Sequence, residues 1–259
     1  MEPKGVGFFS RAWAADLRLF CFPHAGGSAA IYRDWGRLLP KNVAVCPVEL
    51  PGRGVRLKEP LMTDVRSLAE KLAAELRPYL DLPFAFFGHS MGALISFELA
   101  RHLRNRRRSG PAHLFVSGHG GPQLPRRQDP TYDLSEPDFL KRLQTLNGTP
   151  KHILENKELM QLVLPVIRAD FELVETYIYS AEAPLNCPIT AFGGVDDEDA
   201  EPSELDEWRV HTTGGFKRHL FPGDHFFIKS SESLLLKTLG RSVSDCVVAP
   251  NECAEPLLV

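Results

Sequence analysis

The feature that most constrains this chain is a glycine-flanked serine, Ser90, in the sequence Gly-His-Ser-Met-Gly at positions 88–92. A short apolar run typical of a buried strand, Phe84–Phe87, leads directly into it, and an amphipathic helical pattern starts at Ala93. In such a turn the small flanking residues let a strand and a helix pass close together, and the serine hydroxyl is pushed out above the sheet. The segment therefore predicts a strand, a sharp turn and a helix, with Ser90 as a candidate nucleophile.

Short apolar runs alternate with longer amphipathic ones along the rest of the chain. The strand candidates are Leu17–Phe22, Val43–Val48, Phe84–Phe87, Leu114–Ser117, Ile189–Phe192 and Lys217–Phe221. The helix candidates are 29–39, 64–80, 93–105 and 232–239. Alternation of this kind implies an α/β fold with a mostly parallel central sheet and helices on both faces.

The segment between Ser117 and Ile189 contains no clear strand, although 138–146 and 157–179 look helical. An insertion at about 123–185 predicts a helical cap (lid) over the carboxyl edge of the sheet, where open α/β sheets place their ligands. Its apolar positions either line a substrate channel or only pack the cap against the sheet. We expect residues 1–245 to form a single domain and 246–259, with two prolines and little pattern, to be a poorly ordered tail.

A serine hydroxyl is a weak nucleophile at neutral pH and needs a base, which a third group orients. In folds with this turn the chain order is Ser, then Asp or Glu, then His. His225 follows the last strand candidate and fits the base. We expect His219, within the strand pattern, to pack or face solvent, and we place His211 in a polar loop.

The acid should follow the strand candidate Ile189–Phe192, where the loop Gly-Gly-Val-Asp-Asp-Glu-Asp occupies 193–199. Spacing leaves Asp196 and Asp197 as candidates, and the other acidic residues of this run are expected to be solvated. An oxyanion hole needs two backbone N–H groups that point at the developing negative charge. Met91, after the nucleophile, and Ala25, in the loop after the first strand candidate, are the expected donors. We expect His24, in the same loop, to make a structural hydrogen bond.

Five motifs together resemble one family. They are Phe-Pro-His-Ala-Gly-Gly (22–27), Glu-Leu-Pro-Gly-Arg-Gly (49–54), Gly-His-Ser-Met-Gly (88–92), Arg-Ala-Asp-Phe (168–171) with Glu-Thr-Tyr (175–177), and Pro-Gly-Asp-His-Phe (222–226). The set, from about residue 18 to about 240, resembles the type II thioesterases. These are the stand-alone editing enzymes of polyketide and non-ribosomal peptide synthesis, which have the α/β-hydrolase fold and are related to the medium-chain thioesterase of animal fatty-acid synthesis.

The resemblance implies hydrolysis of acyl groups from the phosphopantetheine arm of an acyl or peptidyl carrier protein, which removes aberrant or stalled units. It implies a Ser-His-Asp triad of Ser90, His225 and Asp197, an acyl-enzyme intermediate, and no cofactor or metal. The family's Gly-Gly-x-x-Asp pattern places the acid at Asp197. Asp196 stays in reserve, because this chain continues with Glu-Asp-Ala-Glu where many relatives have a proline-containing segment.

Composition excludes several other classes. The chain has 259 residues, 43% of them hydrophobic and 24% charged, and its net charge of −3 gives no general reason to expect nucleic acid or an anionic membrane as partner. No apolar stretch approaches the roughly 18 residues that span a bilayer, and the first fifteen residues lack the apolar core of a signal peptide. Five cysteines without C-x-x-C spacing argue against disulfides or zinc. We therefore expect a cytoplasmic protein, and the length and initial methionine favour a free-standing one.

Other functions fit parts of the pattern. A carboxylic-ester hydrolase or a medium-chain fatty-acyl thioesterase would use the same nucleophile, although loop 23–27 differs from the His-Gly-Gly-Gly type of many esterases. A catalytically silent carrier-binding protein is the non-enzymatic alternative, against which the full set of candidate residues argues. The basic run Arg101–Arg108 fits either a docking surface for an acidic carrier or, as we favour, solvated cations at a helix C-terminus.

Overall fold

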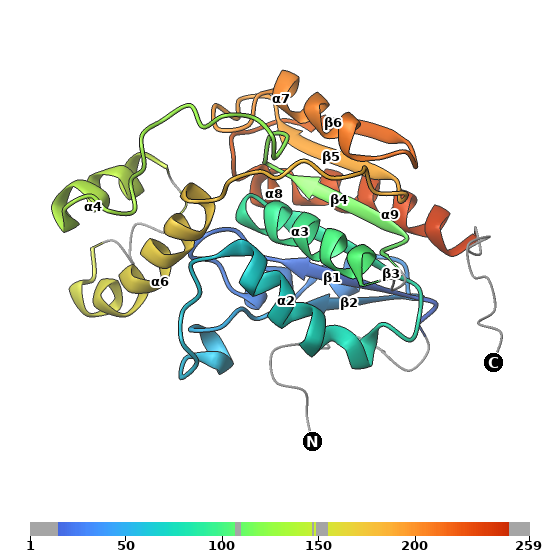
Figure 1. Ribbon diagram of the computed structural model, residues 1–259, viewed down its shortest axis with the longest axis horizontal. Coiled ribbons are helices and arrows are strands. Elements are labelled where there is room, and N and C mark those ends of the chain that lie inside the picture. The colour runs from blue at the N-terminus through green and yellow to red at the C-terminus, as the bar shows by residue number, and fades with distance from the viewer. Residues whose placement is uncertain (1–14, 107–109, 147, 149–154, 249–259) are drawn as a thin grey trace.

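The computed structural model describes residues 15–106, 110–146, 148 and 155–248. Its centre is a six-stranded sheet in the order β2-β1-β3-β4-β5-β6, with every neighbouring pair parallel (Figure 1). The strands are β1 (Leu17–Phe22), β2 (Val43–Pro47), β3 (Phe84–His89), β4 (His113–Ser117), β5 (Ile189–Gly194) and β6 (Phe216–Phe221). The expected α/β fold is confirmed, and only the strand ends differ slightly from the sequence pattern.

Helices cover both faces of the sheet (Figure 1). On one face lie α2 (Val65–Leu76) and α3 (Met91–Asn105), and on the other α1 (Trp35–Leu38) and α9 (Glu232–Val248). In β1, Phe20 and Phe22 pack toward α2 and α3, whereas Leu19 and Cys21 pack toward α1 and α9. Because both faces of β1 to β5 are buried, these strands read as nearly continuous apolar runs in the sequence, whereas the edge strand β6 is more polar and partly exposed.

Several helix boundaries differ from the sequence pattern. The helix expected at 29–39 is divided into the 3₁₀ turn η2 (Ala29–Tyr32) and α1. The helix expected at 64–80 ends as α2 at Leu76 and continues as the 3₁₀ turn η4 (Arg77–Tyr79), because Pro78 has no N–H to continue an α-helical ladder. At the C-terminus α9 runs on to Val248, past the expected end at Leu239 and into the expected tail. Residues 249–259 lie outside the described part of the chain.

In the acidic run after β5, Glu198 and Asp199 are exposed, as expected. The segment that follows is helical. It forms the short helix α7 (Pro202–Asp206), which Glu201 and Glu204 close with a capping box, followed by the 3₁₀ turn η5 (Glu207–His211). Trp208 in this turn is fully buried in the hydrophobic core, so it fixes the segment against the rest of the domain. A further short helix, α8 (Phe227–Ser230), precedes α9.

The cap consists of α4 (Glu136–Thr145) and α6 (Lys157–Glu175), which lie beyond the carboxyl ends of the strands, at the left in Figure 1. It has its own small core, built from Phe139, Leu143, Met160, Leu164 and Ile167. The helix α6 ends at Glu175 rather than at the expected Tyr179. The chain then runs back along α3 toward β5 (Figure 1).

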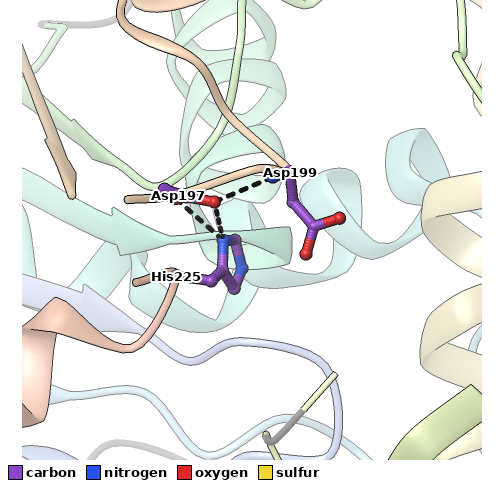
Figure 2. Close-up of side chains that lie close together, drawn as sticks. All are labelled: Asp197, Asp199 and His225. Carbon is purple, nitrogen blue, oxygen red and sulfur yellow. Dashed lines mark hydrogen bonds and ion pairs between the residues drawn. The ribbon is translucent and has the colours of Figure 1, made fainter. Parts of the chain in front are cut away.

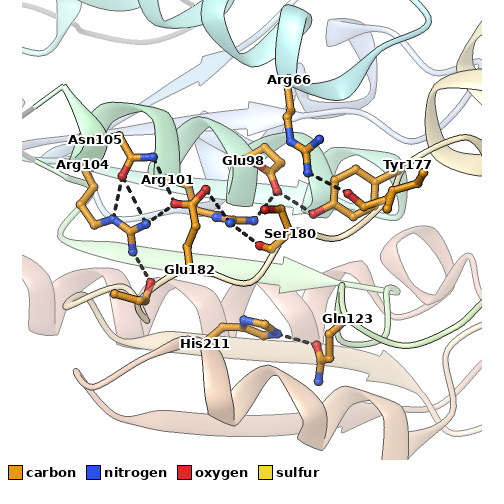
Figure 3. A network of polar contacts seen from close by, with 12 residues as sticks. Arg66, Glu98, Arg101, Arg104, Asn105, Gln123, Tyr177, Ser180, Glu182 and His211 are labelled. Carbon is orange, nitrogen blue, oxygen red and sulfur yellow. Dashed lines mark hydrogen bonds and ion pairs between the residues drawn. The ribbon is translucent and has the colours of Figure 1, made fainter.

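Two arginines of the basic run hold this returning segment instead of forming a free surface (Figure 3). Arg101 is 2% exposed and donates to Glu98 Oε1 at 2.7 Å and to the Ser180 carbonyl at 2.6 Å. Arg104 pairs with Glu182 at 2.5 Å. Helix α3 places them about 15 to 20 Å from Ser90, at 1.5 Å per residue. The expectation of solvated cations is therefore wrong for Arg101, and the contacts favour a structural role for both arginines over carrier docking. Residues 107–109 lie outside the described part of the chain.

Within the described residues no helix is both long and apolar enough to cross a membrane. Cys21, Cys46 and Cys187 are buried free thiols, as expected for small core side chains. Cys246 is a half-buried free thiol on α9, and Cys253 lies outside the described residues.

Candidate active site

Ser90 is the single residue between β3 and α3, and its backbone is strained. Its φ of 53° and ψ of −117° give it the only positive φ of a non-glycine residue in the described part of the chain. A Cβ on Gly88 would lie 2.0 Å from the carbonyl oxygen of Gly92, and one on Gly92 would lie 2.1 Å from that of Phe22. Only glycine fits at both positions, so the expected strand–turn–helix is present with its steric cause. Strain of this kind is often found at functional sites.

His225 and Asp197 meet at the same edge of the sheet, because their loops follow the neighbouring strands β6 and β5. Nδ1 of His225 lies 3.1 and 3.0 Å from the two carboxylate oxygens of Asp197 (Figure 2). Asp197 is 3% exposed, and its Oδ1 also accepts the backbone N–H groups of Asp199 and Ala200 at 3.0 and 3.2 Å. This network holds the carboxylate in one orientation, as an acid that orients an imidazole requires.

The other aspartate candidate lies elsewhere. Asp196 is exposed, and its backbone N–H donates to the carbonyl of Gly223 at 3.1 Å. Of the two neighbours, the structure brings Asp197 and not Asp196 against the imidazole.

One cavity of about 610 Å³ joins these groups to the cap. Ser90, His225 and Ala25 line one part of it. The cap contributes Leu143, Leu146, Ile167, Phe171 and Val174. The two alternatives for the apolar cap positions therefore both hold in part, since Phe139 and Leu164 only pack the cap. Among the described residues no hydrogen bond joins the Ser90 hydroxyl to His225, and such bonds often tighten only when substrate is bound.

The two backbone N–H groups expected to form an oxyanion hole belong to Met91, next to Ser90, and to Ala25, which lines the same cavity. Met91 is the first residue of α3, so its N–H has no partner within the helix and lies at the positive end of the helix dipole. In the loop after β1, the N–H of Gly26 donates to Asp170 at 2.7 Å and that of Gly27 to the His24 carbonyl at 2.9 Å. Within the described bonds the N–H of Ala25 donates to no protein group, which leaves it available to substrate.

The three other histidines weighed from the sequence, His24, His211 and His219, do not contact Asp197 in the described structure. His24 is buried, its Nδ1 lies 3.0 Å from the Ala25 carbonyl, and burial lowers its pKa to about 4. His219 stacks on Phe192 along β6. His211 is buried beside Trp208, so its expected place in a polar loop was wrong.

His225 differs from these because its pKa is raised. Burial alone would lower the pKa, but the hydrogen bond to Asp197 and the charges of Asp197, Asp199 and Asp224 outweigh it. The neighbouring ring of His89 is fully buried and its pKa is lowered, so it adds no fixed positive charge at neutral pH. A base must be neutral to accept a proton, so a raised pKa moves the acid limb of activity to higher pH.

Asp199 is a neighbour of the imidazole that the sequence pattern did not reveal. Its exposed side chain lies beside the ring, with an oxygen of each carboxylate and a ring nitrogen all within 4.8 Å of one another (Figure 2). Asp197, Asp199 and His225 are the group of described residues whose spacing would suit a metal ion. The oxygens of Asp197 are already hydrogen-bonded to the imidazole and to two amides, an arrangement that suits an acid that orients a base.

We expect Asp199→Asn to shift the acid limb of the kcat/KM profile to lower pH, because it removes one of the charges that raise the pKa of His225. Asp199→Glu keeps the charge and is expected to retain the wild-type profile. The shift should shrink in high salt, since the carboxylate is exposed. The measurement is kcat/KM for an acyl thioester between pH 5 and 9, and an unchanged limb in Asp199→Asn would contradict this role.

Known proteins resemble this chain over most of its length. The family model described as "Thioesterase domain" matches residues 17–242. The chain is 47% identical over 237 residues to a protein named linear gramicidin dehydrogenase LgrE from Brevibacillus parabrevis, covering 90% of each. Among solved structures, the RedJ thioesterase from the prodiginine pathway of Streptomyces coelicolor has 40% identity and a TM-score of 0.84, with 90% of this chain and 87% of that one covered. The type II thioesterase BorB from the borrelidin cluster has 34% identity and a TM-score of 0.84, with 94% and 97% covered.

Proposed function

Because the chain belongs to the thioesterase domain family, we propose that it hydrolyses acyl groups from the phosphopantetheine arm of acyl or peptidyl carrier proteins in the cytoplasm. It is a hydrolase of thioesters with the α/β-hydrolase fold, and its relatives place it with the type II thioesterases of polyketide and non-ribosomal peptide pathways. In such a pathway it would remove aberrant or stalled acyl units and so free the carrier.

The proposed mechanism uses the residues assembled around the cavity. His225 takes the proton of the Ser90 hydroxyl while Asp197 holds the imidazole, and the serine oxygen attacks the thioester carbonyl. The N–H groups of Met91 and Ala25 stabilise the resulting oxyanion. The pantetheine thiol leaves, and water activated by His225 then hydrolyses the acyl-enzyme. The observation that most supports this is the contact between the buried carboxylate of Asp197 and His225, because His225 lines one cavity with the strained serine.

The test is hydrolysis of a panel of acyl-pantetheine and acyl-carrier thioesters, beside oxygen esters with the same acyl groups. We expect thioesters, and carrier-bound ones most of all, to have the higher kcat/KM. Faster hydrolysis of the oxygen esters would favour a carboxylic-ester hydrolase. A failure to label with a serine-directed fluorophosphonate would favour a silent carrier-binding protein. The name of the first relative suggests a redox role for that protein, but the dinucleotide motif G-x-G-x-x-G does not occur in this sequence.

We expect Val174→Phe to select against long acyl chains, because this half-buried side chain of α6 lines the cavity and a larger ring fills part of it. The ratio of kcat/KM for octanoyl- over acetyl-pantetheine should fall about tenfold, as contacts worth one to two methylenes are lost. Leu162→Phe is the matched control, since Leu162 lies on the same helix but is 66% exposed. An equal kcat/KM ratio in Val174→Phe and wild type would show that Val174 does not contact the acyl chain.

A further inference from the structure

An ion pair joins the cap to the part of the chain that holds the oxyanion donor. Arg53, in the Pro-Gly-Arg-Gly turn after β2, donates from Nη1 and Nη2 to the two carboxylate oxygens of Asp170, both at 2.6 Å. The side chains are 8% and 1% exposed, and Asp170 lies in the C-terminal half of cap helix α6. A two-pronged pair of this kind fixes orientation as well as distance.

Both partners also hold the backbone of the loop after β1. Asp170 Oδ2 accepts the N–H of Gly26 at 2.7 Å, and Arg53 Nη1 donates to the carbonyl of Gly27 at 3.1 Å. The same helix packs directly on this loop, because a Cβ on Gly26 would come within 2.9 Å of Ile167 Cγ1. The residue just before these anchors is Ala25, the expected oxyanion donor.

Stability alone does not explain this arrangement. A buried ion pair rarely stabilises a fold more than well-packed apolar side chains of the same size. The Nε–H of Arg53 is also buried with no hydrogen-bond partner among the described residues, which is unfavourable. The orientation that the pair gives to the loop backbone is the property that an apolar pair would lack.

We propose that Arg53 and Asp170 are positioning residues of the reaction: their ion pair fixes the loop after β1 so that the N–H of Ala25 points at the oxyanion on Ser90. The pair thereby couples that donor to α6, whose next residues Phe171 and Val174 line the acyl cavity. Helix α6 therefore both lines the acyl cavity and, through Asp170, fixes the loop whose Ala25 N–H stabilises the transition state. This inference rests on the proposed function through the role of Ala25.

The chain offers a control in a second buried arginine, two residues after the Pro-Gly-Arg-Gly turn. Arg56 is 2% exposed and donates to the two carboxylate oxygens of Glu75 at 2.9 and 2.8 Å, but Glu75 lies on α2. Neither Arg56 nor Glu75 has a hydrogen bond to residues 23–27 in the described structure. Arg56 also donates to Glu59, so Glu75→Gln neutralises one of the two carboxylates that pair with this buried arginine. Asp170→Asn likewise neutralises a carboxylate that pairs with a buried arginine, and only Asp170→Asn disturbs the oxyanion loop.

We expect Asp170→Asn to lower kcat for acyl-pantetheine by about tenfold or more with KM changed less than about threefold, since a misdirected donor weakens transition-state binding. Glu75→Gln should keep both constants within about threefold of wild type. The double variant Arg53→Met/Asp170→Leu leaves no charge unpaired, so it should fold, as judged by circular dichroism, and still show the low kcat.

Two further probes separate this proposal from the proposed function. p-Nitrophenyl acetate needs the nucleophile and the oxyanion hole but neither pantetheine nor carrier, so it reports on the loop even if acyl-pantetheine is not a substrate. 1-Propylboronic acid forms a tetrahedral adduct on a serine nucleophile, and we expect its Kd to rise about tenfold in Asp170→Asn and not in Glu75→Gln. A folded Asp170→Asn or double variant with wild-type kcat on p-nitrophenyl acetate and wild-type boronate affinity would overturn the proposal. A wild-type protein inert toward every probe would overturn both.

Discussion

Replacing Ser90 by alanine is expected to lower kcat for acyl-pantetheine by about 10⁴-fold or more, because no other described group in the cavity replaces the lost nucleophile. The oxyanion donors and the cavity remain, so KM should change little. The measurement is steady-state hydrolysis, followed by release of the free pantetheine thiol. Circular dichroism should show an unchanged fold, because the side chain of Ser90 makes no hydrogen bond in the described structure.

Ser90→Gly gives a second, independent readout of the same residue. Glycine adopts a φ of 53° without the strain that serine bears, so this variant should be inactive and more stable than wild type by about 1 kcal/mol. The stability is measured by urea denaturation. Turnover by Ser90→Ala at a rate near that of wild type would rule out Ser90 as nucleophile, and a less stable Ser90→Gly would contradict the strain argument.

The parts of the fold that the sequence predicts best are those specified by nearby residues. Every strand except the edge strand β6 is a short apolar run ended by glycine, proline or charge. The turn at Ser90 carries its own steric requirement in Gly88 and Gly92. His225 follows from chain order once the last strand is placed. Helix ends are specified less locally. The helical pattern of α6 extends to Tyr179 in the sequence, but the helix ends at Glu175, and the Tyr177 hydroxyl donates to Glu98 at 2.6 Å.

Contacts between segments that are distant in the chain could not be predicted from the sequence. Arg53 and Asp170 are 117 residues apart, so the motifs that contain them pointed to a family without revealing that they touch. Asp199 looked like one of several solvated acids, and only the closeness of the loops after β5 and β6 places it beside His225. The closeness of these loops also distinguishes two neighbouring residues: Asp197 is buried against His225, whereas Asp196 is exposed.

Because Asp197 and not Asp196 contacts His225, we expect substitution of Asp197 to have the second large effect on activity. Asp197→Asn is expected to lower kcat by about 10³- to 10⁴-fold, because an amide that donates toward Nδ1 of His225 favours the wrong imidazole tautomer. The loss of the charge also removes the largest contribution that raises the pKa of His225, so the acid limb of the residual activity should move to lower pH. The measurement is a pH profile of kcat/KM with acyl-pantetheine.

Asp196→Asn is the matched control for this variant, since it makes the same chemical change one residue away on an exposed side chain. It should keep kcat within about twofold and leave the pH limb in place, because surface substitutions away from a site rarely matter. The opposite pattern would make Asp196 the acid and would require the loop after β5 to rearrange when substrate binds. Equal, small effects of both substitutions would mean that His225 acts without an orienting carboxylate, and the buried hydrogen bonds that hold Asp197 would then serve the fold alone.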